Sequence, residues 1–294
     1  MNLKQIIVIV AVVIISGYLY LQPVKGLIKP NAAKPERGAA AGSRPSIPKV
    51  TVEQVSEQGK AAIGAALAAT INDLEGQLKN ASSDADKLNL QKKLAKQWDD
   101  DNQPAPSAFY YLEAARSENT FNNWVNAGNH FNDASKLTQD TTVQPALIAN
   151  AIEAFENATK LKPDNLDAET GLGVAYANQA LAGMMDPSGG PPKGIMILLD
   201  VVKKDPGNYK ANLNLGQLAV QSRQFDKAVN RFKTAIANAS HSDNIVEPYF
   251  FLAESYKQLG MRKEAIEAYQ KCKQMIPDPV IGQKIEQYIK ELKN

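Results

Sequence analysis

Two stretches near the carboxyl end follow one pattern and decide the fold. Residues 209–240 read YKANLNLGQLAVQSRQFDKAVNRFKTAIANAS, and residues 246–277 read VEPYFFLAESYKQLGMRKEAIEAYQKCKQMIP. Each opens with apolar residues at helical spacing around a pair of a large and a small residue, Leu215-Gly216 or Leu252-Ala253. Each then has a small residue, an aromatic residue four positions later and a second small residue: Ala228, Phe232 and Ala235, or Ala265, Tyr269 and Cys272. The spacing predicts two amphipathic helices in each stretch.

Three earlier copies of the pattern follow once insertions between the two helices are allowed. The first copy comprises Leu94, Ala95, Trp98, Ser107, Tyr111 and Ala114. The second comprises Trp124, Ala127, Gly128, Phe131, Ala151, Phe155, Ala158 and Pro163. The third comprises Leu172, Gly173, Tyr176, Gly194, Leu198, Val201 and Pro206. We therefore predict five repeats, at about 88–120, 121–165, 166–208, 209–245 and 246–279, followed by a capping helix at 280–294.

This pattern resembles the tetratricopeptide repeat (TPR), a helix–turn–helix unit of about 34 residues. The resemblance implies an all-α fold, a right-handed α-solenoid in which consecutive helix pairs stack. The packing argument agrees, because a single helix pair cannot bury its apolar face and needs a neighbour to cover it. Small residues such as Gly128 and Ala151 let two helices approach, and large ones such as Phe155 fill the space between pairs.

By the same resemblance, the first helix of each repeat lines a concave groove that binds extended peptides or helices of other proteins. The candidate groove residues are Lys92, Lys96, Asn122, Asn126, Asn129, Asn214 and Gln217, and the same groove holds Asp133, Asn178, Lys210, Gln221 and Glu254. Side-chain amides both donate and accept hydrogen bonds, so they can bind a ligand's backbone without demanding a sequence. A solvated helix face without a ligand is the alternative.

The two insertions offer a second candidate surface. Residues 135–145 (SKLTQDTTVQP) are polar, and residues 182–194 (AGMMDPSGGPPKG) place Met184 and Met185 before a turn rich in proline and glycine. Exposed methionines make adaptable contacts with partners. Loops that merely tolerate insertion, with both methionines packed against a helix end, are the alternative.

Composition argues against several classes of function. The 294 residues include one Cys and two His, which leaves no ligand set for a multi-cysteine metal site. Neither a nucleophile elbow nor a His-Glu-x-x-His helix occurs, and the prolines of 188–194 spoil its likeness to a phosphate loop. Residues 50–294 carry 26 basic and 30 acidic side chains, unlike a nucleic-acid-binding domain. We expect no enzyme, no cofactor, no metal and no nucleic-acid partner.

The amino-terminal end predicts attachment to a membrane. Residues 6–21 (IIVIVAVVIISGYLYL) are uncharged, and within an anchor over 1–28 they predict a transmembrane helix that contacts the lipid bilayer. A cleaved signal peptide is the alternative. Residues 29–51 predict a basic linker rich in alanine, proline and glycine, and residues 52–87 predict an amphipathic helix.

The side of the membrane depends on two opposing signals. A short amino-terminal tail before an apolar run is typical of a signal-anchor, which would place the repeats in the periplasm of a bacterium, attached to its inner membrane. The basic residues after the run favour a cytoplasmic body instead. We predict a membrane-anchored scaffold or adaptor that binds partner proteins in its groove. The alternative is a structural organiser of the cell envelope that forms homo-oligomers through residues 52–80.

Overall fold

The computed structural model describes residues 49–138, 140–184, 192–241 and 243–293. These residues form 13 α-helices and no strand, as the sequence predicts for an all-helical solenoid. The expected transmembrane span at 6–21, nearly all of the linker at 29–51, and Met185 lie outside the described residues. None of the described helices is both long and apolar enough to cross a membrane.

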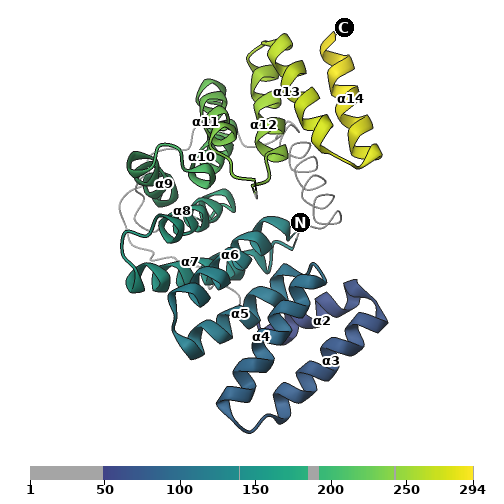
Figure 1. Cartoon of the computed structure of the whole chain (residues 1–294), viewed down its shortest axis with the longest axis vertical. Coiled ribbons are helices and arrows are strands. Elements are labelled where there is room, and N and C mark those ends of the chain that lie inside the picture. The colour runs from purple at the N-terminus through teal and green to yellow at the C-terminus, as the bar shows by residue number, and fades with distance from the viewer. Residues whose placement is uncertain (1–48, 139, 185–191, 242, 294) are drawn as a thin grey trace, which may run out of the picture.

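The helices follow one another as antiparallel neighbours in a stack that curves into a C (Figure 1). Their bounds are α2 (Val52–Ile63), α3 (Ala65–Asn80), α4 (Asp84–Asp100), α5 (Pro104–Glu118), α6 (Phe121–Leu137), α7 (Gln144–Leu161), α8 (Leu166–Leu181), α9 (Lys193–Lys204), α10 (Tyr209–Gln221), α11 (Phe225–Ala237), α12 (Val246–Gln258), α13 (Arg262–Met275) and α14 (Pro279–Lys293). In Figure 1, α8 and α10 lie on the inner side of the curve, and α9 lies outside them.

The first helices of successive pairs touch one another directly, as the inner side of a curved stack requires. The Asn132 side-chain amide on α6 donates a hydrogen bond of 3.0 Å to the Gly171 carbonyl on α8. Helix α8 in turn contacts α10, and α10 contacts α12. The helices α6, α8, α10 and α12 therefore form the inner face of the solenoid.

Glycines on this inner layer make room for aromatic rings from the outer layer. The ring of Phe155, on α7, is fully buried and lies between Gly128 on α6 and Gly171 on α8. A methyl group added at Gly128 would come within 2.7 Å of that ring, and one at Gly171 would come closer still. Gly216 meets the ring of Phe232 in the same way. This alternation of small and large residues sets the distance between helices.

The amphipathic segment predicted over 52–87 is divided in the structure. Gly64 has a φ of 85°, a conformation that only glycine adopts easily, and it separates α2 from α3. A second break follows α3, after which the Ser83 hydroxyl accepts a hydrogen bond of 3.0 Å from the Asp86 amide and caps α4. Two short helices and the first turn of α4 replace the single helix.

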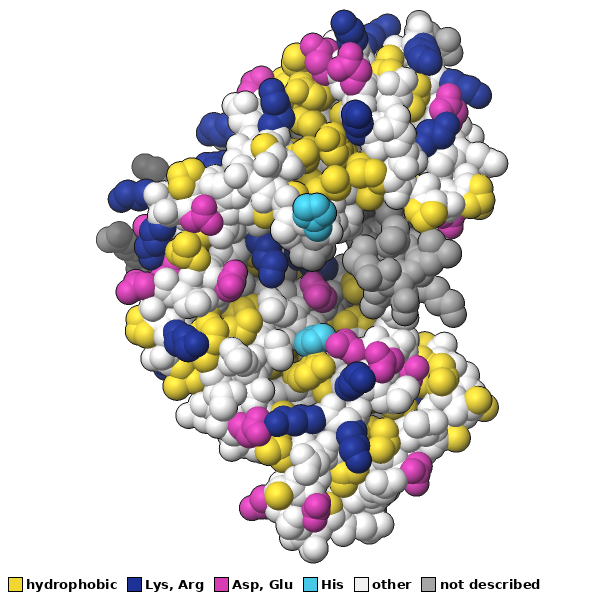
Figure 2. Space-filling view, in the orientation of Figure 1, with side chains coloured by type: hydrophobic (Ala, Val, Ile, Leu, Met, Phe, Trp, Pro, Cys, Tyr) yellow, Lys and Arg dark blue, Asp and Glu magenta, His cyan; other side chains and the backbone are white. Residues whose placement is uncertain are grey.

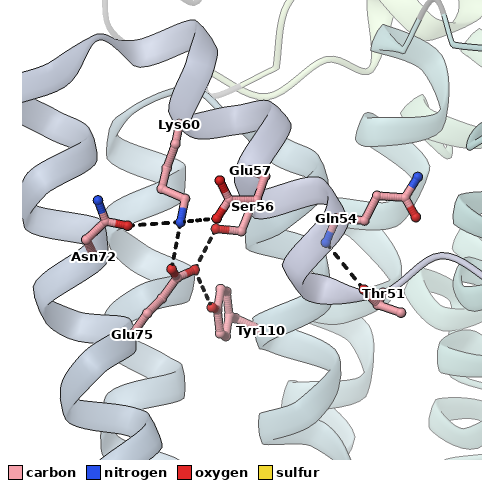
Figure 3. A network of polar contacts seen from close by, with 8 residues as sticks. All are labelled: Thr51, Gln54, Ser56, Glu57, Lys60, Asn72, Glu75 and Tyr110. Carbon is pink, nitrogen blue, oxygen red and sulfur yellow. Dashed lines mark hydrogen bonds and ion pairs between the residues drawn. The ribbon is translucent and has the colours of Figure 1, made fainter.

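A polar network fixes these two helices to the stack (Figure 3). The Glu75 carboxylate on α3 accepts hydrogen bonds from Ser56 at 2.5 Å, from Tyr110 at 2.9 Å and from Lys60 at 3.0 Å. Ser56 and Lys60 belong to α2, and Tyr110 belongs to α5, so one carboxylate joins three helices. Burial and the negative charge of Glu75 raise the pKa of Tyr110, which keeps its hydroxyl protonated as a donor.

The apolar face of residues 52–80 is used within the chain. Ile71 is fully buried in a cluster with Leu94, Trp98 and Tyr110. The alternative of self-association depended on this face, and its central side chain is already covered by α4 and α5. At the other end of the stack, Ile285 and Ile289 of α14 are buried against the last helix pair.

Candidate functional site

The inner face carries a row of polar side chains that crosses five of the helix pairs. We call this set the inner polar row: Asp99, His130, Asp133, Lys136, Asn178, Lys210, Asn214, Gln217 and Glu247. It starts on α4 and reaches α12. Figure 2 shows acidic and basic side chains gathered in the hollow at the middle of this face.

The length of α6 brings Lys136 within reach of Asn214, another member of the row. This helix has 17 residues, whereas α10 has 13, so its last turn extends beyond a regular repeat. The extra turn includes Ser135 and Lys136, which the sequence predicted to open a polar insertion. The Lys136 ammonium donates to the Asn214 side-chain oxygen at 3.5 Å, and the Asn178 amide donates to the Ser135 hydroxyl at 3.3 Å. Lys136 thus reaches over α8 to a residue 78 positions away.

Helices α10 and α12 are joined across the same face. The Gln217 amide donates a hydrogen bond of 2.5 Å to the Glu247 carboxylate. The Asn214 amide donates at 2.8 Å to the Lys210 carbonyl on its own helix, which turns its oxygen toward Lys136. These bonds hold amide and carboxylate groups at set positions along the groove.

Two carboxylates in the row have unusual electrostatics. Asp133 is exposed in the hollow and Glu247 is half-buried, yet protein lies around both. This partial desolvation raises the pKa of each carboxyl, and the charge of Asp133 raises the pKa of Glu247 further. Lys136 acts against both shifts. No ion pair within 4 Å reaches either carboxylate from the residues that the structure describes.

The end of the row on α4 is arranged differently. Asp99 lies 3.2 Å from the ring nitrogen Nδ1 of His130 and accepts a hydrogen bond of 3.2 Å from Ser107. The Tyr111 ring stacks on the His130 ring, with 4.4 Å between their centres. Burial and the charges of Asp99 and Asp100 raise the pKa of Tyr111. Asp99 is therefore already occupied by partners within the chain.

The structure places the predicted groove residues in different surroundings. Asn214 and Gln217 belong to the inner polar row. Lys92 forms an ion pair of 2.7 Å with Glu118, at the end of α5, so its charge is already paired within the chain. The side chains of Lys96, Asn122 and Asn126 are exposed, and Asn129 is half-buried. Of the predicted insertion surface, Met184 is half-buried, and its backbone amide donates to the Gln179 carbonyl at 3.1 Å.

Sequence reasoning missed Asp99, His130, Lys136 and Glu247 as members of the site. Glu247 could have been found, since it is the second residue of its predicted repeat, as the groove candidate Lys210 is of the preceding one. Lys136 could not, because its position depends on how far α6 continues into the insertion.

The described residues offer no centre for metal or thiol chemistry. They include no group of three or more His, Cys, Asp or Glu side chains that could hold a metal ion. The thiol of Cys272 is buried, and burial raises its pKa to about 12. The arrangement is suited to hydrogen bonding and charge pairing along a groove.

Comparisons with known proteins agree with the stacking. Residues 246–279 match the family model described as "Tetratricopeptide repeat". No curated protein sequence matches the chain. TTC0263, a thermophilic TPR protein of Thermus thermophilus, is similar in structure with a TM-score of 0.50 and 17% identity, over 70% of this chain and 98% of that one. A chain of the APC/C hetero-tetramer Cut9–Hcn1 is similar in structure with a TM-score of 0.50 and 15% identity, over 82% of this chain but 43% of that one. At these identities the likeness shows the fold alone.

Proposed function

We propose that this chain, a TPR-like solenoid with a matched tetratricopeptide repeat at residues 246–279, is a non-enzymatic scaffold that binds segments of partner proteins in its inner groove. TPR proteins bind other proteins, and their fold is in general a scaffold without catalytic activity. The observation that carries the proposal is the inner polar row, which continues over α4, α6, α8, α10 and α12.

The chemistry of the row suits an extended protein segment. Asn126 is exposed on the inner helix α6 and offers an amide with both a donor and an acceptor. A typical hydrogen bond to a ligand contributes about 0.5–1.5 kcal/mol, so several are needed for a stable complex. Because the row spans several repeats, one extended segment can meet many of its groups at once.

Photo-crosslinking in cells tests this proposal. A benzoylphenylalanine introduced at Asn126 or Gln221, both exposed on first helices, should give discrete covalent adducts with partner proteins. The same probe at Asn230 or Gln270, exposed on the outer helices α11 and α13, should give few or none. Equal adducts from both faces, or adducts from the outer face alone, would refute the groove as the binding surface.

We also propose that residues 6–21 anchor the scaffold in a bacterial inner membrane, with the repeats in the periplasm. The support is the uncharged apolar run after a very short tail. Tethering would raise the local concentration near the membrane, so modest affinity in the groove would suffice. Alkaline phosphatase fused after Asn294 should be active and a green fluorescent reporter dark. The opposite result would place the repeats in the cytoplasm.

A further inference from the structure

Two carboxylates at the middle of the groove have no ion-pair partner within 4 Å among the residues that the structure describes. Asp133 lies on α6 and Glu247 on α12, and the hydrogen bonds from Lys136 to Asn214 and from Gln217 to Glu247 join both helices to α10 at this point. The charge of Asp133 acts on Glu247, and that of Lys136 acts on both carboxylates. Lys210 and His130 also act on Asp133, whereas Asp99 adds to the negative charge around it. Since Asp99 is already engaged by His130 and Ser107, it does not compete for a ligand.

Hydrogen bonding leaves the same two carboxylates incompletely satisfied. Glu247 accepts one bond, from Gln217, and the carboxylate of Asp133 accepts none from the residues that the structure describes. Lys136 donates to the Asn214 oxygen. An ionised carboxylate has about four acceptor sites, so both groups retain free acceptor capacity facing the hollow.

We infer that the bound segment places a basic side chain, lysine or arginine, between Asp133 and Glu247. This inference rests on the proposed function of the groove and names the chemistry of its ligand. An ammonium or guanidinium group there would donate charge-assisted hydrogen bonds to both carboxylates, which are stronger than neutral ones. A carboxylate in the same place would add a third negative charge beside Asp133 and Glu247, against the two cations Lys136 and Lys210.

The acid–base behaviour of the site is consistent with a preference for a basic side chain. Partial desolvation raises the pKa of both Asp133 and Glu247, so their ionised forms are disfavoured in the free protein. A cation between them favours ionisation, and its binding should therefore release protons where the free carboxyls are partly protonated. The selectivity for basic ligands should weaken as the pH falls, because the protonated carboxyls no longer attract a cation.

Oriented peptide pools test the inference on the full chain in detergent micelles. The probes are biotinylated random octapeptides with blocked ends and one fixed central residue: lysine, arginine, norleucine or glutamate. Biolayer interferometry at pH 7.5 should give an affinity about tenfold or more higher for the lysine and arginine pools than for norleucine, as expected for a charge-assisted hydrogen bond. At pH 5 this ratio should shrink.

Variants separate the contribution of the two carboxylate charges to binding from that of the rest of the groove. Asp133→Asn with Glu247→Gln keeps the shape of both side chains and should reduce the lysine-to-norleucine ratio to about one. The matched control is Asp226→Asn, which removes an exposed carboxylate on the outer helix α11 and should leave the ratio unchanged. Circular dichroism must match that of the unaltered chain and the urea midpoint must not be lower, so that a lost preference reflects binding.

The remaining outcomes would contradict either the inference alone or both the inference and the proposed function. If all pools bind equally and Asn126→Ala with Gln217→Ala weakens them all, the groove binds protein segments but the inference of a basic side chain is wrong. A preference for the glutamate pool would also overturn it. If no pool binds above a surface without peptide, both the inference and the proposed function fail.

Discussion

Replacing Gly171 with alanine should destabilise the solenoid although alanine is the better helix former. The added methyl group would lie far inside van der Waals distance of the ring of Phe155, which is fully buried and also packs against Gly128. Overpacking of a core typically costs about 1–3 kcal/mol, and exchanging glycine for alanine within a helix recovers about 1 kcal/mol. Because the approach of the methyl group to the ring is far below van der Waals distance, we expect the upper part of the overpacking range, about 2–3 kcal/mol, and hence a net loss of about 1–2 kcal/mol. For a domain of this size, that lowers Tm by roughly 2–8 °C.

Thermal unfolding followed by circular dichroism measures this loss, and Gly76→Ala provides the control. Gly76 lies within helix α3, and an added methyl group there meets nothing within 4 Å. It should therefore stabilise the chain by about 0.5–1 kcal/mol. Opposite signs for the two variants are the expected result. A rise in Tm for Gly171→Ala equal to that for Gly76→Ala would show that the close packing of Phe155 is absent.

Three further predictions concern other parts of the molecule. Glu75→Ala leaves the buried donors Ser56 and Tyr110 without their acceptor, so urea unfolding should show a loss of about 2–3 kcal/mol. A loss below about 0.5 kcal/mol would contradict the network. The pKa values of Asp133 and Glu247 are raised in the folded chain, which therefore binds these protons more tightly than the unfolded chain does. The two groups thus lower the free energy of unfolding at pH values above their raised pKa, and they have no such effect below the ordinary carboxyl pKa. Asp133→Asn with Glu247→Gln should therefore raise Tm at pH 7.5 and leave it unchanged at pH 3, and equal shifts at both pH values would refute the electrostatic cause. Cys272, with a pKa of about 12, should react with a thiol reagent at pH 8 only as fast as the chain unfolds, and immediate reaction in buffer would show that it is accessible.

The sequence was sufficient for features that repeat at a fixed spacing. Gly128, Phe155, Gly216 and Phe232 each stand at a position where the pattern requires a small or a large side chain, and the structure uses them to set the distance between helices. Such positions can be recognised because every repeat packs against its neighbour in the same way and therefore needs residues of the same size at the same positions. The division into five repeats and the sense of the superhelix stay predictions.

Features that occur only once were not predictable. Gly64 interrupts a segment whose apolar spacing continues through it, so the spacing alone could not reveal the break. The bond from Lys136 to Asn214 depends on the extra turn of α6 and on the curvature of the stack, neither of which follows from local spacing. The site was therefore only partly predictable: Asn214 and Gln217 follow from the repeat pattern, whereas Lys136 requires the three-dimensional arrangement.

The measurement that tests the central claim most directly is the affinity for a partner segment identified by crosslinking, with and without the inner amides. Asn126→Ala with Gln217→Ala removes two hydrogen-bonding groups from the groove and should weaken binding about tenfold or more. Asn230→Ala with Gln270→Ala removes two amides from the outer helices and should leave the affinity unchanged. If the outer pair weakens binding and the inner pair does not, the partner binds the convex face and the groove is not the site.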